Sequence, residues 1–118
     1  MTPGRNEELI IEKSDRPSGV HLIRLSGPLT LRTLFDFQEA ARLDHEHPII
    51  VDVGSVPYMD SAGLGALIGT YASCQRSERK FAIANVPDRV KVLFEMTGVV
   101  GLIPIFGSVD EAEASVTG

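Results

Sequence analysis

The sequence predicts a single α/β domain with a mixed β-sheet of four to five strands, flanked by about four helices. One observation is the segment 49–53, a continuous apolar run typical of a strand buried on both faces of a parallel sheet. The other is a set of segments with apolar residues at i, i+3, i+4 and i+7, as in helices packed on a sheet. Strands and helices alternate along the chain, which implies parallel pairing through right-handed crossovers.

The N-terminal third is predicted to form a β-hairpin and then a helix. The β-rich runs 9–13 and 20–25 are separated by the turn-forming stretch "SDRPSG", so they should pair with each other. A helix is expected over 31–44, before Pro48. Its residues at helical spacing are Leu34, Phe37 and Ala41, with Leu31 and Phe35 alongside.

After the strand 49–53, we expect a helix over 62–76, a strand over 81–84 and a second helix over 88–97. Gly98 stands where a helix C-terminal glycine belongs. The inward-facing residues of the two helices are Leu64, Leu67, Ile68 and Tyr71 in the first, and Val90, Leu93, Phe94 and Thr97 in the second.

The chain should end in an irregular edge strand and a short helix. Pro104 within "LIPIF" lacks an N–H group, which limits that strand to an edge or to irregular pairing. The stretch "SVDE" has the S-x-x-E pattern of a capping box and opens the last helix. The inward-facing residues of this helix are Val109, Ala112 and Val116.

Length and charge restrict the class of protein. The 118 residues suit one domain, 1–118, with its core at about 8–116. A net charge of −5 argues against binding to nucleic acid or to anionic lipid, so a protein partner or a small ligand is expected. We expect a cytoplasmic protein, because no apolar run is long enough for a membrane span and the first residues lack the features of a signal peptide.

Ser61, directly after Asp60, stands at the start of the predicted helix 62–76. Both residue types are good N-caps, and sequence rules favour a plain cap for Ser61. The other interpretation is an exposed hydroxyl whose phosphorylation the helix would tolerate, because a helix N-terminus favours negative charge.

The glycines of "GLGALIG" do not have the spacing of a nucleotide-binding fingerprint, which needs its first glycine at the strand end and an acid about 20 residues on. Gly65 and Gly69, four residues apart, instead predict a flat helix face for close packing. Ala62 and Gly63 are expected to leave the start of the helix open to a docking protein.

No catalytic, metal or cofactor site is predicted. The other candidates for chemistry are two acids, a thiol and three imidazoles: Asp52, Asp60, Cys74, His21, His45 and His47. The acids could be the pair of a hydrolase but lack an evident base or metal ligands. The thiol is expected in the core, the first histidine in a strand and the other two in a surface turn.

The block "IIVDVGSVPYMDSAGLGALIGTY" resembles the signature of the STAS domain, and within that family the anti-sigma factor antagonists of bacteria. The stretches "LSGPLTLRT" and "VPDRVKVLFEMTGV" resemble the family's strand-end G-x-L segment and its penultimate helix. The resemblance covers nearly the whole chain and implies a STAS-like fold.

In such antagonists an anti-sigma factor with serine kinase activity phosphorylates the matching serine, and a serine phosphatase reverses this. The unmodified form binds the anti-sigma factor and frees a sigma factor for transcription. By position, the resemblance implies that Ser61 accepts the phosphate and that Thr33 matches a Thr/Ser at the start of the family's first helix. The implied partner contacts are Asp60, Ala62, Gly63, Leu64 and Thr33.

The chain departs from the family after G-x-L, where Thr30 replaces the usual Asp and Pro28 precedes it. The resemblance implies a binding protein that is a monomer or a weak dimer, with no enzymatic activity and no cofactor. The alternative is a STAS scaffold or a transport-associated subunit in which Ser61 is not phosphorylated. A third class, a nucleotide-binding enzyme, would require saturable nucleotide binding or turnover.

Overall fold

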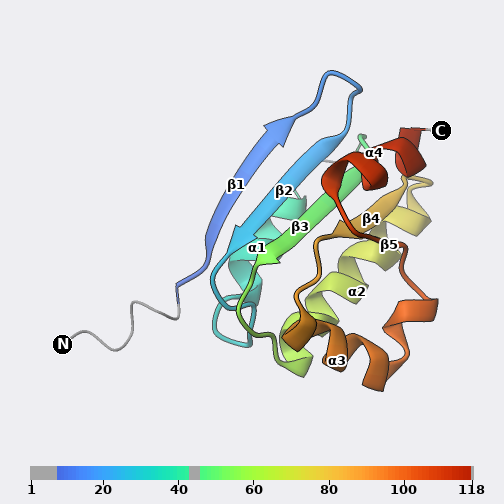
Figure 1. Cartoon of the computed structure of the whole chain (residues 1–118). Coiled ribbons are helices and arrows are strands. Elements are labelled where there is room, and N and C mark those ends of the chain that lie inside the picture. Colours follow the sequence, from blue (N-terminus) through green and yellow to red (C-terminus); the bar gives the residue numbers. More distant parts are fainter. Residues whose placement is uncertain (1–7, 43–45, 118) are drawn as a thin grey trace.

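The structure, a computed structural model, describes residues 8–42 and 46–117. It contains a five-stranded sheet in the order β1-β2-β3-β4-β5 (Figure 1). The strands are β1 (Ile10–Asp15), β2 (His21–Ser26), β3 (Ile49–Ser55), β4 (Phe81–Ala84) and β5 (Ile105–Phe106). β1 runs antiparallel to β2, and all other neighbours are parallel. The hairpin and the mixed sheet are therefore confirmed.

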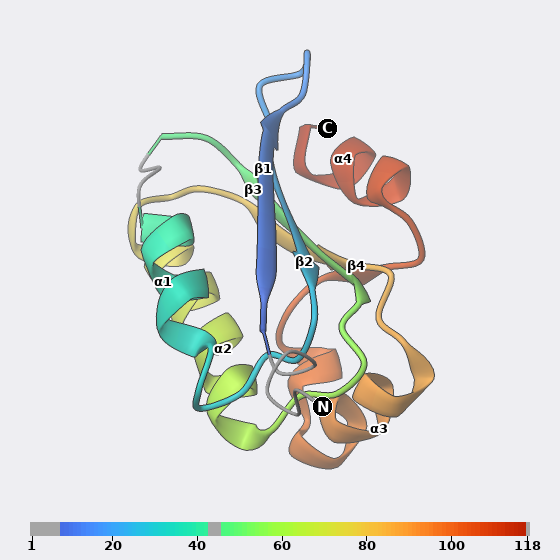
Figure 2. The same ribbon diagram turned by 90° about the vertical axis from the view of Figure 1, so that its left-hand side faces the viewer.

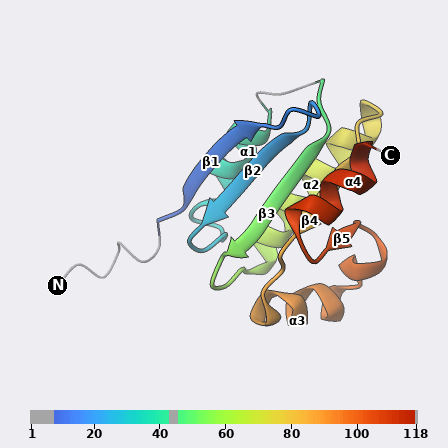
Figure 3. The same cartoon turned by 45° about the horizontal axis from the view of Figure 1, so that its top comes forward.

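The helices lie on both faces of the sheet. They are α1 (Leu34–Arg42), α2 (Ser61–Arg76), α3 (Asp88–Thr97) and α4 (Val109–Thr117), and a short 3-10 helix η2 (Val99–Gly101) follows α3. Seen along the sheet edge, α1 and α2 cover one face and α4 the other, with α3 near one end (Figure 2). α4 lies over β3 and β4 (Figure 3).

The core has two parts because β3 is buried on both faces. Ile49, Val51 and Val53 pack into the larger cluster with α1, α2 and α3, whereas Ile50 packs into the smaller cluster under α4. The five residues 49–53 are all buried. This confirms the prediction of a central strand made from the continuous apolar run.

α1 begins later than expected. It starts at Leu34 rather than at residue 31, because a turn occupies the preceding residues: the N–H of Leu34 donates to the Thr30 carbonyl at 2.8 Å, and the N–H of Thr30 donates to Thr33 Oγ1 at 3.0 Å. Leu31 therefore lies outside the helix and is 64% exposed. Phe35 lies within α1, but its side chain also stays out of the core and is 67% exposed. The expected end at residue 44 lies outside the described residues.

The C-terminal elements match their predictions closely. α3 spans 88–97, and Gly98 ends it with a φ of 78°, in the left-handed region. The prediction that Thr97 faces inward is wrong, because Thr97 is exposed and its hydroxyl donates to the Leu93 carbonyl at 2.8 Å. β5 is a two-residue edge strand behind Pro104, as its missing N–H group requires.

α4 is capped and held to the hairpin by side chains. The Ser108 hydroxyl accepts the N–H of Glu111 at 3.1 Å, which confirms half of the capping box. Arg16, in the turn between β1 and β2, pairs with Glu113 at 2.9 Å and with Asp110 at 3.2 Å. The Ser18 hydroxyl also donates to Glu113. These contacts, which we call the hairpin clasp, join segments that are about 95 residues apart in the chain.

None of the helices in the described part of the chain is long and apolar enough to cross a membrane.

Candidate functional site

The start of α2 is organised by Asp60. Its Oδ1 accepts the N–H of Gly63 at 2.8 Å, which makes Asp60 the N-cap and Ser61 the first helical residue. Its Oδ2 accepts the N–H of Leu31 at 3.1 Å. One carboxylate thus both caps α2 and fastens the neighbouring loop, residues 27–33, to the helix start.

Ser61 is exposed, and its hydroxyl makes no hydrogen bond with any residue that the structure describes. The interpretation of Ser61 as a plain N-cap is wrong, because Asp60 occupies that position. A serine at the first helical position places its hydroxyl beside backbone N–H groups that have no partner within the helix. The hydroxyl is therefore accessible and has no structural task in the described part of the molecule.

Gly63 is the glycine of this segment on which packing depends. It is buried, and a Cβ atom there would lie 2.0 Å from the Leu29 carbonyl oxygen, far inside van der Waals contact. The expectation that Gly63 leaves the helix start open is wrong, since this close approach lets the 27–33 loop lie against α2. Ala62 beside it is half-buried, and Leu64 is 3% exposed.

Gly65 and Gly69 do not form a close-packed face, so that prediction is wrong as well. Both are exposed, and a Cβ atom at either would meet no atom within 4 Å. The two glycines are four residues apart on α2, but no other element packs closely against either of them.

Backbone contacts hold the two loops on either side of Ser61 together. The N–H of Leu29 donates to the Tyr58 carbonyl at 3.3 Å, and Leu29 and Met59 form a parallel bridge. In Figure 2 the loop that leads into α1 lies beside the first turn of α2. The Ser61 surface is therefore built from two loops and a helix start.

Thr33 stabilises the 27–33 loop from within. It is 6% exposed, its hydroxyl donates to the Pro28 carbonyl at 2.9 Å, and its Oγ1 accepts the N–H of Thr30. Thr30 accepts the N–H of Arg32 through Oγ1 at 3.2 Å. Among the positions named from the resemblance, Asp60, Ser61 and Ala62 reach the surface, whereas Thr33, Gly63 and Leu64 lie beneath it.

Three exposed apolar side chains on these elements were not anticipated. Leu31 and Phe35 are about two-thirds exposed, and Tyr58 is 47% exposed. They lie on the 27–33 loop, the first turn of α1 and the loop before Asp60. The sequence does contain a signal for the exposure of Leu31 and Phe35. They are four residues apart, but at helical spacing they lie off the stripe of Leu34 and Phe37. We call these three side chains the apolar rim.

The two acids considered for catalysis have separate structural partners. Asp52 is 6% exposed; its Oδ2 accepts Arg24 Nε at 3.0 Å, and its Oδ1 accepts the N–H of Gly54 at 2.9 Å and Asn85 Nδ2 at 3.2 Å. Asp60 caps α2. Neither carboxylate is placed as one of an acid pair.

Cys74 and the described histidines lie in different elements and loops of the fold. Cys74 is fully buried, as predicted, and His21 lies in β2 with Nδ1 2.8 Å from Asp15 Oδ1. His47 is exposed, whereas His45 lies outside the described residues. Within 8–42 and 46–117, no group of three or more His, Cys, Asp or Glu could hold a metal ion.

Comparison with known proteins gives a consistent result. The family model for the STAS domain matches residues 13–112. The anti-sigma-B factor antagonist of Staphylococcus aureus (strain NCTC 8325 / PS 47) is 33% identical over 86 residues, which are 70% of this chain and 80% of that protein.

Solved structures share the fold. An anti-sigma factor antagonist from Mycobacterium paratuberculosis has a TM-score of 0.86 at 21% identity, covering 94% of this chain and 96% of the other. The anti-sigma factor antagonist SpoIIAA in its unphosphorylated form has a TM-score of 0.74 at 20% identity, covering 91% and 96%. Helix α2 and the sheet therefore belong to a fold that these proteins have in common.

Proposed function

Because this chain belongs to the STAS domain family and, within it, to the anti-sigma factor antagonists, we propose that it binds an anti-sigma factor through the surface around Ser61. The partner is also the kinase that phosphorylates Ser61, and a separate serine phosphatase removes the phosphate. Unmodified protein sequesters the anti-sigma factor and so frees a sigma factor; phosphorylated protein does not. This is the activity of a cytoplasmic binding protein rather than of an enzyme.

The observation that supports this proposal most strongly is that Asp60 makes the structural hydrogen bonds at the start of α2 and that the Ser61 hydroxyl makes none with the described residues. Asp60 satisfies the helix start and anchors the 27–33 loop, so Ser61 is exposed and contributes no hydrogen bond to the described fold. A serine whose hydroxyl holds no structure can be modified without unfolding the helix that carries it.

The electrostatics of the helix start make a phosphate there tolerable. Phosphorylation adds about −1.5 to −2 charge at pH 7. The N-terminus of α2 favours that charge by about 0.3–1 kcal/mol, and the neighbouring Asp60 opposes it. Because these contributions largely cancel, the modified protein should stay folded.

In a complex the same charge has a much larger effect. A partner surface shaped for a small hydroxyl would desolvate the phosphate without pairing it, at a cost on the order of 3 kcal/mol or more. That corresponds to a loss of affinity of over about a hundredfold. Binding is therefore the property that phosphorylation controls.

The contact surface extends beyond the signature segment. Asp60 and Ala62 flank Ser61, and the apolar rim provides the exposed leucine, phenylalanine and tyrosine side chains that protein interfaces bury. Thr33, Gly63 and Leu64 support this surface from beneath, so their substitution should act through its shape rather than through lost contacts.

A phosphate-transfer assay tests the proposal. Purified protein is incubated with labelled ATP, with and without the anti-sigma factor kinase from the same cells. We expect labelling only with the kinase, complete loss in Ser61→Ala, and normal labelling in Ser115→Ala, which removes an exposed serine from α4 on the opposite face of the sheet. Equal labelling of Ser61→Ala, or labelling without kinase, would contradict the proposal. No labelling of the wild type would favour the unswitched scaffold or transport-associated subunit.

A further inference from the structure

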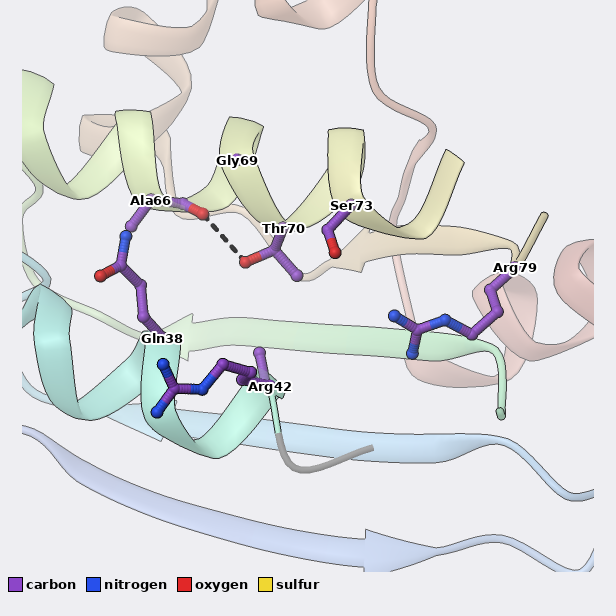
Figure 4. A pocket seen from close by; sticks show the side chains of 8 residues that line it. Gln38, Arg42, Ala66, Gly69, Thr70, Ser73 and Arg79 are labelled. Carbon is purple, nitrogen blue, oxygen red and sulfur yellow. Dashed lines mark hydrogen bonds between the residues drawn. The ribbon is translucent and has the colours of Figure 1, made fainter. Parts of the chain in front are cut away.

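A hollow of about 240 Å³ lies between α1 and α2 (Figure 4). We call it the α1–α2 groove. On α2 it begins at Ala66 and passes Gly69 to reach Ser73. Gly69 stands eight residues after Ser61, roughly 12 Å along the helix at 1.5 Å per residue. The groove is therefore separate from the Ser61 surface.

Small residues line part of the groove, and one of them, Gly69, is not required by the backbone conformation or the packing of the described residues. Its φ is not in the left-handed region, and a Cβ atom there would meet nothing within 4 Å. Glycine inside a helix lowers helix stability relative to alanine. What Gly69 does provide, together with Ala41 and Ala66, is open space between the two helices.

The lining of the groove also contains polar and positively charged side chains. Arg42 and Arg79 line the groove, and among the residues that the structure describes no Asp or Glu does, although the chain has a net charge of −5. The Gln38 amide and the Ser73 hydroxyl also line it, and neither makes a hydrogen bond to another residue in the described ranges. In Figure 4 Gln38 extends toward α2, and Arg79 reaches in from the far end.

Both guanidinium groups make contacts within the protein. Arg42 pairs with Glu39 through Nη2, and Arg79 donates to Ser77 Oγ through Nε and to the His47 carbonyl oxygen through Nη1. A guanidinium carries five N–H donors in a planar fork that matches the geometry of a carboxylate or a phosphate. The positive charge of the two arginines, their N–H donors and the open space of the groove are thus complementary to an oxyanion.

We propose that the α1–α2 groove binds a small molecule bearing a phosphate or carboxylate group. Arg42 and Arg79 hold the oxyanion, and Gln38 and Ser73 provide further hydrogen bonds. The groove is slightly smaller than the usual range for ligand pockets, about 300–1,000 Å³, which favours a compact metabolite over a protein segment.

Amide chemical shifts of the ¹⁵N-labelled full chain test this proposal. The protein is titrated separately with sodium phosphate and sodium citrate, with sodium chloride at matched ionic strength as the reference. We expect saturable shifts at Gln38, Gly69 and Ser73 with at least one oxyanion and none with chloride. A phosphate response alone identifies a phosphate ligand, and a citrate response alone identifies a carboxylate ligand. Arg42→Gln should weaken binding about tenfold, because it removes a charge-assisted donor pair.

Two glycine variants separate the groove from the rest of α2. Gly69→Leu should fill the groove and abolish the saturable shifts. Gly65→Leu, also exposed but outside the groove, should bind like the wild type, and both variants should fold because neither new side chain meets a neighbour at Cβ. Shifts that do not saturate, that centre elsewhere, or that persist in Gly69→Leu overturn the proposal. Such a failure leaves the Ser61 proposal untouched, since the phosphate-transfer assay does not involve the groove.

Discussion

At the scale of single residues, Asp60 and Ser61 differ in what the fold requires of them. Asp60→Ala should lower the free energy of unfolding by about 1–2 kcal/mol, because α2 loses its N-cap and the Leu31 N–H loses its acceptor. Ser61→Ala should change it by less than about 0.5 kcal/mol. Urea unfolding of the two variants measures both values. Equal destabilisation would mean that Ser61 holds structure and would remove the main support for a regulatory role.

Gly63 offers a second test at this scale. Gly63→Ala places a methyl group against the Leu29 carbonyl and should destabilise the protein by about 1–3 kcal/mol or more. Gly65→Ala, two residues along the same helix, should stabilise it by about 0.5–1 kcal/mol, since the methyl group meets nothing. The melting temperatures of Gly63→Ala and Gly65→Ala, compared with that of the wild type, test this difference. Similar melting temperatures would show that the 27–33 loop does not lie closely against α2.

The sequence identified the right pair of residues at the helix start but not their tasks. Asp and Ser both favour the N-cap, so local propensity cannot decide between them. The second bond of the Asp60 carboxylate, to the Leu31 N–H about 30 residues away in the chain, forms only in the folded molecule and has no local sequence signal. For the same reason no local pattern distinguished Gly63, which packs closely, from Gly65, which faces solvent.

At the scale of elements, the hairpin clasp should make stability depend on pH. Hydrogen bonds from Ser18 and then from Arg16 lower the pKa of Glu113 below its ordinary value of 4.5. A carboxylate with a lowered pKa contributes stability above its unfolded-state pKa and loses it as pH falls through the folded-state pKa. The clasp should therefore stabilise the fold at neutral pH and cease to do so in acid.

Glu113→Gln tests this dependence. At pH 7 the variant should be less stable than the wild type, and the difference should be smaller at about pH 3, because the wild-type carboxylate takes up protons as the pH falls. Glu95→Gln is the matched control, because Glu95 is exposed on α3 and has no side-chain partner in the described ranges. Urea midpoints at both pH values give the comparison. A difference that is independent of pH, or equal in the control, would show that the clasp carries no ionic stabilisation.

The elements that depend on local patterns were the ones that could be predicted. β4 and α3 match their expected ranges, and β3 contains its expected range, because a buried run and an apolar stripe with a terminal glycine are local signals. The start of α1 could not be predicted in this way. The hydrogen bonds of Thr30 and Thr33 form a turn there, which leaves Leu31 outside the helix and in solvent. Phe35 lies in the first turn of α1 but off the stripe of Leu34 and Phe37, so its side chain is exposed as well.

At the scale of the whole molecule, the Ser61 surface lies where α/β folds commonly place their sites. Ser61 begins α2 after the loop that follows the carboxyl end of β3, which lies centrally in the parallel part of the sheet. The core beneath is complete without the Ser61 hydroxyl. The molecule can therefore keep its fold while its surface changes charge, which is the property that a switch needs.

Isothermal titration calorimetry of phosphorylated and unphosphorylated protein with the anti-sigma factor, paired with melting curves of both forms alone, tests the central claim most directly. The account predicts equal melting temperatures within a few degrees and an affinity lower by over about a hundredfold for the phosphorylated form. Ser61→Ala should bind with the affinity of the unphosphorylated wild type. Equal affinity of the two forms, or a large loss of thermal stability on phosphorylation without the partner, would contradict a switch at this surface.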